Sequence, residues 1–129
     1  NDIELSAQIF EQLISDRPSS SKYYFEASKS WYQSEKLNKA IQVLNRLDDA
    51  KGISVETCLK KHRWYLELGN NKEAEKELVK IHNKEPDNQY VTASFVDFYF
   101  RTGQTEKAIL NLKKSSMGLK ERLEALFKK

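Results

Sequence analysis

The chain has 129 residues, and its 22 basic and 19 acidic side chains give a net charge of +3. Charged residues make up 32% of the sequence, whereas there are only four glycines, two prolines and one cysteine. A composition so poor in helix-breaking residues predicts a mostly helical protein. The mixed charge argues against nucleic-acid binding, and one cysteine excludes an internal disulfide. No apolar run approaches the ~18 residues of a membrane span, so we expect no direct membrane insertion.

Apolar periodicity and turn residues predict eight antiparallel helices. In chain order they cover residues 2–16, 20–34, 37–49, 54–68, 71–84, 88–102, 105–116 and 119–128. The last of them places four large apolar residues, Leu119, Leu123, Leu126 and Phe127, on one face. This helix is expected either to cap the stack or to begin another repeat.

A repeat with a period of 34 residues runs through the chain. Ala40, Ala74 and Ala108 are 34 residues apart, and several other classes of residue share this spacing. The other series are Trp31, Tyr65 and Tyr99; Glu35, Gly69 and Gly103; Leu44, Leu78 and Leu112; and Pro18, Gly52 and Pro86. Because independent positions share one period, the sequence predicts a stack of similar helix pairs.

This period and its motif resemble the tetratricopeptide repeat (TPR) family. When each repeat is numbered from 1 to 34, the family has an aromatic residue at 11, glycine near 15, alanine at 20 and proline at 32. The structural repeat positions that match are Trp31, Ala40, Tyr65, Gly69, Ala74, Pro86, Tyr99, Gly103 and Ala108. The resemblance implies an all-α fold, a right-handed α-α superhelix known as a TPR solenoid.

The register of the repeats assigns residues 1–129 to a single TPR domain. Residues 1–20 match the second helix of a partial repeat, and residues 21–54, 55–88 and 89–122 form full repeats, the last one irregular. Residues 119–129 hold the capping or next-repeat helix. Because the register starts within a repeat, we expect the chain to be a piece of a larger TPR protein.

Two departures from the family pattern fall in the second repeat. Lys61 stands where the family prefers leucine, and His62 stands where it prefers glycine or alanine. The first helix of this repeat is therefore expected to be looser or differently packed. Cys58 and His62 have the i, i+4 spacing of a metal-binding pair, but both fall on packing positions, and no second pair has matching spacing. Packing is the favoured interpretation of both residues.

The sequence contains no motif that indicates catalysis. Carboxylate pairs such as Asp48 and Asp49 cluster near helix ends and are expected on a solvated surface. There is no phosphate-binding glycine-rich loop and no nucleophile motif. We therefore expect a protein that is not an enzyme, with no catalytic residues, no metal ligands and no cofactor.

The resemblance implies a concave groove lined by the first helix of every repeat, with positions 2, 5, 9 and 12 facing inward. Large apolar side chains with charged residues between them are typical of protein-binding hot spots. The predicted protein-binding groove consists of Lys22, Phe25, Lys29, Tyr32, Glu56, Leu59, Arg63, Leu66, Tyr90, Asp97 and Phe100. Ala93 occupies the remaining position.

One known ligand of such grooves is excluded. Co-chaperone TPR domains hold the C-terminal carboxylate of large chaperones with Lys, Asn, Asn, Lys and Arg at five fixed positions. This chain has Phe25, Lys29, Lys60, Tyr90 and Ser94 at those positions. The chaperone carboxylate clamp is therefore absent from these repeats.

The favoured hypothesis is a non-catalytic scaffold module of a larger TPR protein, which binds a protein or peptide through the concave groove. One alternative is a helical-repeat RNA-binding module. RNA binding is disfavoured because the groove includes Glu56 and Asp97. The other alternative is a purely structural segment, whose groove residues pack against another part of the parent protein.

A second resemblance concerns the location of the protein. Residues 47–54 and 113–123 resemble stretches of large bacterial repeat proteins, many of them lipoproteins, from some Gram-negative cell envelopes. This resemblance implies a periplasmic or outer-membrane-associated location.

Overall fold

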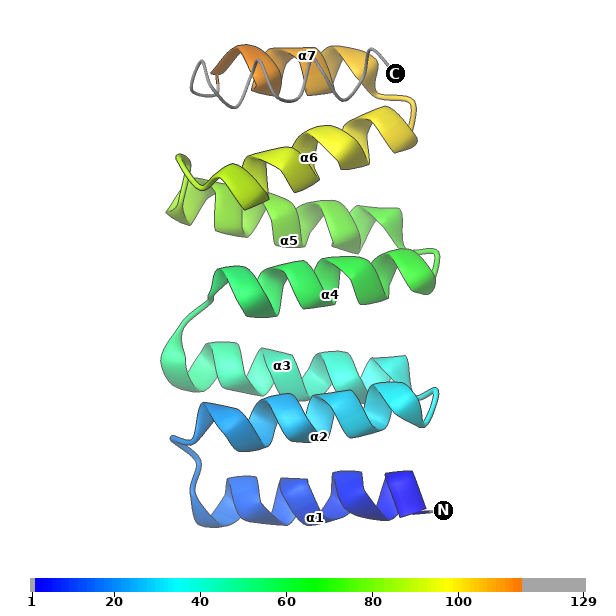
Figure 1. The fold of residues 1–129 in the computed structure, drawn as a ribbon, viewed down its shortest axis with the longest axis vertical. Coiled ribbons are helices and arrows are strands. Elements are labelled where there is room, and N and C mark those ends of the chain that lie inside the picture. Colours follow the sequence, from blue (N-terminus) through cyan, green and yellow to red (C-terminus); the bar gives the residue numbers. More distant parts are fainter. Residues whose placement is uncertain (1, 115–129) are drawn as a thin grey trace.

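In the described part of the chain seven α-helices follow one another as an antiparallel stack along one long axis (Figure 1). The computed structural model describes residues 2–114, and the side chains of residues 2–110. The helices are α1 (Asp2–Asp16), α2 (Ser21–Gln33), α3 (Leu37–Lys51), α4 (Val55–Glu67), α5 (Asn71–Lys84), α6 (Gln89–Arg101) and α7 (Thr105–Lys114). No strand occurs within this described part, so the predicted all-α fold is confirmed. The first six helices end within two residues of their predicted bounds, and the predicted helix 119–128 lies outside the described residues.

The turn between the two helices of each repeat has the same backbone conformation. Glu35, Gly69 and Gly103 have φ angles of 63°, 76° and 77°, which lie in the left-handed region. In each turn the following amide closes the helix, as when Lys36 N donates to Trp31 O at 2.9 Å. Glycine adopts this conformation freely, whereas a residue with a Cβ pays roughly 1–2 kcal/mol. Glu35 is therefore strained at the position where the other repeats have glycine.

We predict that Glu35→Gly stabilises the protein. The strain that is relieved exceeds the extra chain entropy of glycine in the unfolded state, so we expect a gain of about 0.5–1 kcal/mol in the free energy of unfolding. Urea denaturation followed by circular dichroism measures this change. The control is Gln42→Gly, an exposed site within α3, which should destabilise by roughly 1 kcal/mol. A loss of stability in Glu35→Gly would show that the turn is not strained.

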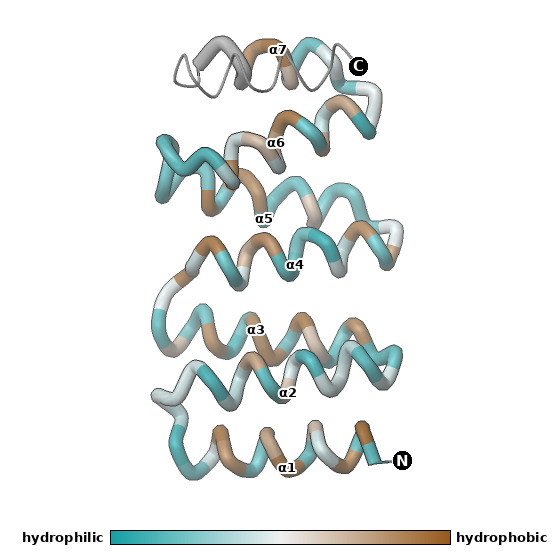
Figure 2. Tube along the Cα trace, in the orientation of Figure 1, coloured by the Kyte–Doolittle hydropathy of each residue, from teal (hydrophilic) through white to brown (hydrophobic). Residues whose placement is uncertain are grey.

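The apolar residues form two main core clusters and one small one. Small side chains allow close helix approach, and Ala40, Ala74 and Ala108 are all fully buried. The first cluster takes its residues from α1, α2 and α3 together with Trp64 of α4, and the second takes them from α5, α6 and α7. Figure 2 shows apolar positions recurring between polar ones along these helices, as amphipathic packing requires. The two clusters therefore meet at α4.

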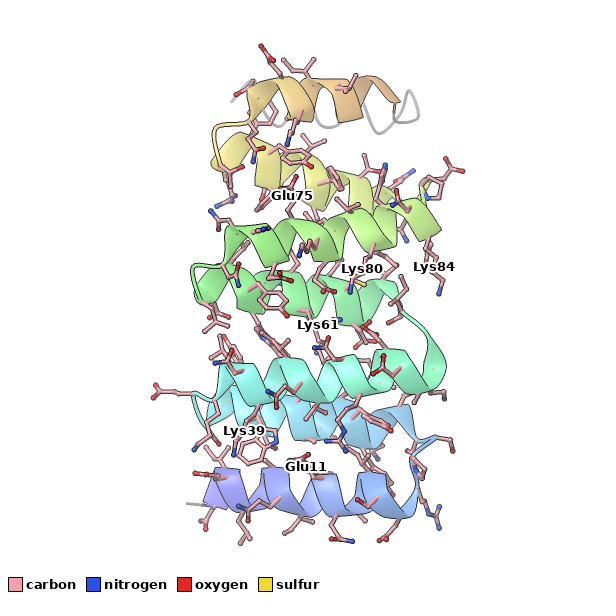
Figure 3. The ribbon with its side chains drawn as sticks, turned by 180° about the vertical axis from the view of Figure 1, so that it is seen from behind. Glu11, Lys39, Lys61, Glu75, Lys80 and Lys84 are labelled. Atoms are coloured by element: carbon pink, nitrogen blue, oxygen red, sulfur yellow. The ribbon has the colours of Figure 1, made fainter. Side chains whose placement is uncertain are left out.

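In each repeat an aromatic side chain of the first helix contacts the last helix of the preceding repeat. Trp31 Nε1 donates to Glu11 Oε2 at 3.0 Å, and Tyr99 OH donates to Glu75 Oε2 at 2.7 Å. Tyr65, at the same repeat position, packs against both main core clusters. Both carboxylates are labelled in Figure 3. The aromatic series at repeat position 11 thus joins successive repeats as well as filling the core.

Lys61 is the centre of a buried polar junction between the two main clusters. Its side chain is 1% exposed, and Nζ donates to Asp48 Oδ2 at 2.6 Å and to Asn45 Oδ1 at 2.9 Å on α3. On the other side Nζ pairs with Glu77 Oε1 of α5 at 3.0 Å. Figure 3 shows Lys61 between α3 and the α4–α5 pair. Burial favours the neutral amine, but Asp48 and Glu77 outweigh it and raise the pKa of Lys61.

The junction corrects one expectation from the sequence and explains another. Asp48, expected on a solvated surface, has a side chain only 8% exposed, because it accepts from Lys61 and, at 2.7 Å, from Thr57 Oγ1. Thr57 also forms a capping box with Ser54 at the start of α4. The first helix of the second repeat is therefore differently packed, since charged groups occupy the space that leucine fills in the family.

We predict that Lys61→Met destabilises the protein strongly. It leaves the Asp48 and Glu77 carboxylates buried without their cation, which costs about 3–5 kcal/mol in the free energy of unfolding. The matched control is Lys80→Met, because Lys80 also pairs with Glu77, at 3.0 Å, but is 45% exposed. That exposed pair should contribute less than about 1 kcal/mol. Equal losses for the two variants would contradict a special role for Lys61.

Candidate protein-binding site

The twelve positions predicted to line the groove share one pattern of exposure in all three repeats. We call this set, on α2, α4 and α6, the groove face. Positions 2 and 9 are exposed in every repeat, and they hold Lys22, Glu56, Tyr90, Lys29, Arg63 and Asp97. Positions 5 and 12 are half-buried in every repeat, and they hold Phe25, Leu59, Ala93, Tyr32, Leu66 and Phe100. The groove face therefore has two exposed rows that alternate with two half-buried rows of mostly large apolar residues.

A hollow of about 380 Å³ lies between α4 and α6 on this face. It is lined by Leu59, His62, Arg63, Leu66, Ser94, Asp97 and Arg101, four of which were predicted as groove residues. Arg101 Nε donates to both oxygens of Asp97, at 2.9 and 2.8 Å, so these two charges neutralise each other. Arg63 makes no ion pair within the described residues. The hollow thus offers one unpaired guanidinium beside two leucine side chains.

Between α2 and α4 the predicted residues contact each other. The ring of Tyr32 stacks on Trp64 with 5.3 Å between ring centroids, and its hydroxyl donates to Glu67 Oε1 at 2.9 Å. The hydrogen bond to Glu67 and partial burial raise the pKa of Tyr32. Lys60 Nζ lies 5.6 Å from the ring centre of Phe25, a cation–π contact between the two helices. Tyr32 and Phe25 therefore serve the packing of adjacent repeats as well as the surface.

The structure does not gather all predicted residues into one cavity. Phe25 and Glu56 border a separate hollow of about 290 Å³ near the loop between α3 and α4. Phe100 packs against the second core cluster. Tyr90 is 78% exposed at the start of α6. A larger hollow, of about 490 Å³, is lined by described side chains of α5 alone and includes none of the predicted residues.

Sequence reasoning missed three residues of the hollow between α4 and α6. Ser94 and Arg101 are at repeat positions 6 and 13, each next to a predicted position. A wider helical stripe would have included them, because i+4 neighbours share a face. His62 was assigned to packing, and it is indeed 6% exposed, yet it also borders the hollow. The signal that could have identified His62 is its bulky ring, which stands where the TPR pattern has glycine or alanine.

Cys58 and His62 are both buried, and neither resembles a metal ligand. Cys58 packs with Ile81 and Val91, and burial raises the pKa of its thiol to about 11, which disfavours the thiolate that binds metals. His62 Nδ1 lies 2.9 Å from the carbonyl oxygen of Ala74, so Nδ1 carries the proton. Among the described residues no group of three potential metal-binding side chains comes together.

We predict an acid-sensitive contribution from His62. Burial lowers its pKa below the ordinary value of 6.5, so the unfolded chain takes up this proton at a higher pH than the folded protein. The stability contributed by the neutral ring is present above pH 6.5 and is lost as the pH falls. Urea denaturation at about pH 7.5 and about pH 5 should show this loss.

The loss should shrink in His62→Gln, whose amide can still donate to Ala74. His82→Gln leaves His62 in place and should retain the part of the acid dependence that His62→Gln removes. If both variants behave like the original protein, the acid sensitivity has another source.

The fold belongs to the class of helical-repeat solenoids, with TPR-like helix pairs. Solved structures of MamA share it. One aligns with a TM-score of 0.72 and 17% identity, covering 95% of this chain and 70% of that chain. MamA MSR-1 aligns at 0.66 and 20% identity with the same coverage, and MamA AMB-1 at 0.64 and 20%, covering 84% of this chain and 59% of that chain.

At these identities the likeness shows the fold. No family model matches the sequence, and no curated protein matches it. In the part of the chain that the structure describes, every helix is too short or too polar to cross a membrane.

Proposed function

We propose that this chain is a non-catalytic protein-interaction module of a larger TPR protein, and that it binds a peptide or protein segment along the groove face. The observation that carries the proposal is the regular alternation of exposed and half-buried rows across three repeats. Such a surface presents apolar area with polar groups on either side, which is how protein-binding sites are commonly built. The solenoid fold supports it, because stacked repeats create extended binding surfaces.

Tyr90 and Arg63 are the residues best placed to contact a partner. Tyr90 is the most exposed large side chain among the exposed apolar residues of the described chain, at 78%. Arg63 is exposed and borders the hollow between α4 and α6. Tyrosine and arginine are enriched among residues that dominate binding energy, because they combine a large contact area with directed hydrogen bonds.

The two alternatives are less well supported. RNA binding by helical repeats relies on a basic groove, whereas the exposed rows of the groove face include Glu56 and Asp97. A purely structural role accounts for Tyr32, which already stacks on Trp64, but it requires another part of the parent protein to cover Tyr90. An interaction surface accounts for both classes of residue.

We predict that Arg63→Ala/Tyr90→Ala weakens partner capture at least about tenfold, while the midpoint of thermal unfolding stays nearly unchanged. The assay is affinity capture from an extract of the source cells, with the immobilised 129-residue chain and quantification of bound proteins. The matched control is Arg17→Ala/Leu110→Ala, which removes an exposed arginine and an exposed apolar residue elsewhere.

Support for the proposal is a captured protein that is lost with the groove variant and retained with the control. The proposal is wrong if the groove variant captures the same proteins as the original chain, or if the control loses them equally.

A further inference from the structure

Resting on the proposed function, we infer the chemistry of the partner: a peptide segment in which an acidic residue lies close to an aliphatic one. The acidic side chain would lie between Lys29 and Arg63, and the aliphatic side chain would enter the hollow between α4 and α6. Failure of this inference and failure of the groove itself give different results in the binding experiment that tests it.

Two positive charges at repeat position 9 are the reason to expect an acidic residue in the partner. Lys29 on α2 and Arg63 on α4 occupy this position in adjacent repeats, and both side chains are exposed. Within the described residues neither makes an ion pair, so two like charges stand in one row without a carboxylate between them. An anion placed between them would relieve their repulsion and gain two charge-assisted hydrogen bonds.

The neighbouring acidic groups do not fill this role. Glu67 Oε1 of α4 already accepts a hydrogen bond from the Tyr32 hydroxyl at 2.9 Å. Asp97, the third residue of the position 9 row, is held by two hydrogen bonds from Arg101. Glu56 is exposed at position 2 of α4, two helical turns from Arg63, where Lys22 of α2 occupies the same row. The positive charge of the row is therefore local to its first two repeats.

The hollow between α4 and α6, which Arg63 also borders, is the site for the aliphatic residue of the peptide. Leu59 and Leu66 border the hollow of about 380 Å³ together with Arg63. A hollow of this size holds a single aliphatic side chain with room to spare, and removal of that side chain from water favours binding. Arg63 borders this hollow and carries a positive charge, so a carboxylate and an aliphatic group can be bound side by side.

A peptide fits this surface better than a nucleic acid does. Nucleic acids are held by rows of cations that neutralise many phosphates, with aromatic platforms for the bases. On the groove face Lys29 and Arg63 are two exposed cations of one row, and the ring of Tyr32 is covered on one side by Trp64. One carboxylate next to one aliphatic group matches both the charge and the shape of the site.

The test is a selection from a phage library of random peptides of about twelve residues, long enough to cross three helices when extended. The bait is the 129-residue chain, and Arg63→Ala/Tyr90→Ala serves to remove peptides that bind elsewhere. We expect the peptides specific to the groove to be enriched in Asp or Glu within two positions of Leu, Ile or Val. Their affinity should fall by about 100-fold in Lys29→Glu/Arg63→Glu.

The matched control is Arg17→Glu/Lys72→Glu, which changes the net charge equally at exposed sites outside the groove face and should bind normally. The inference is overturned if groove-specific peptides carry no excess of acidic residues, or if both charge-reversed variants bind equally well. In that case the groove still binds peptides, and the proposed function stands. If Arg63→Ala/Tyr90→Ala binds every peptide that the original chain binds, so that none is specific to the groove, the groove itself is rejected.

A parallel titration with labelled single-stranded RNA at about 50 mM salt decides between the two classes of anionic partner. We expect no binding that depends on Lys29 and Arg63. RNA binding that is lost in Lys29→Glu/Arg63→Glu and kept in Arg17→Glu/Lys72→Glu would replace the peptide with a nucleic acid.

Discussion

The contact of Lys61 with α3 and α5 is the interaction on which the arrangement of the two halves depends. A repeat cannot bury its own apolar face, so every boundary between repeats must hold by contacts across it. At the boundary between α3 and α4 Trp64 supplies apolar packing, and the buried ammonium group of Lys61 meets Asp48 and Asn45 of α3 and, on its other side, Glu77 of α5. Directional polar contacts of this kind are satisfied in one relative orientation of the helices, because each donor must meet its acceptor. Stability alone does not explain such a junction, since leucine would pack there without a cost of desolvation.

The orientation fixed at this boundary also sets the relation between α2 and α4, which carry the first two rows of the groove face. Tyr32 stacks on Trp64 and Lys60 lies over Phe25, so the surface between the two helices is already assembled before any partner arrives. A surface that is preorganised in this way loses less entropy on binding. The same contacts explain why five of the eleven predicted groove residues are half-buried. One side of each side chain packs between repeats, and the other side remains exposed on the groove face. Arg63, Lys29 and Tyr90, by contrast, project from the surface and are available to a partner.

Most of the fold could be predicted because the repeat period is carried by residues whose role is local. Ala74 is small where two helices meet, and Gly69 is glycine where the chain needs a positive φ angle, so each can be interpreted without knowledge of distant residues. The polar junction could not be predicted, because Asp48, Lys61 and Glu77 come from three helices and only the stack brings them together. For the same reason the burial of the Asp48 side chain could not be predicted. The groove face was predicted as a stripe, but its division into separate hollows depends on side-chain contacts such as that of Arg101 with Asp97.

The most direct test of this account is to map where a partner contacts the folded chain. Backbone amide resonances of the isotopically labelled 129-residue chain would be followed during titration with a captured protein or a selected peptide. We expect the shifts to concentrate on α2, α4 and α6, around Lys29, Arg63 and Tyr90, while α3 and α5 change little. Shifts confined to α1, or to the second helices α3 and α5, would contradict it.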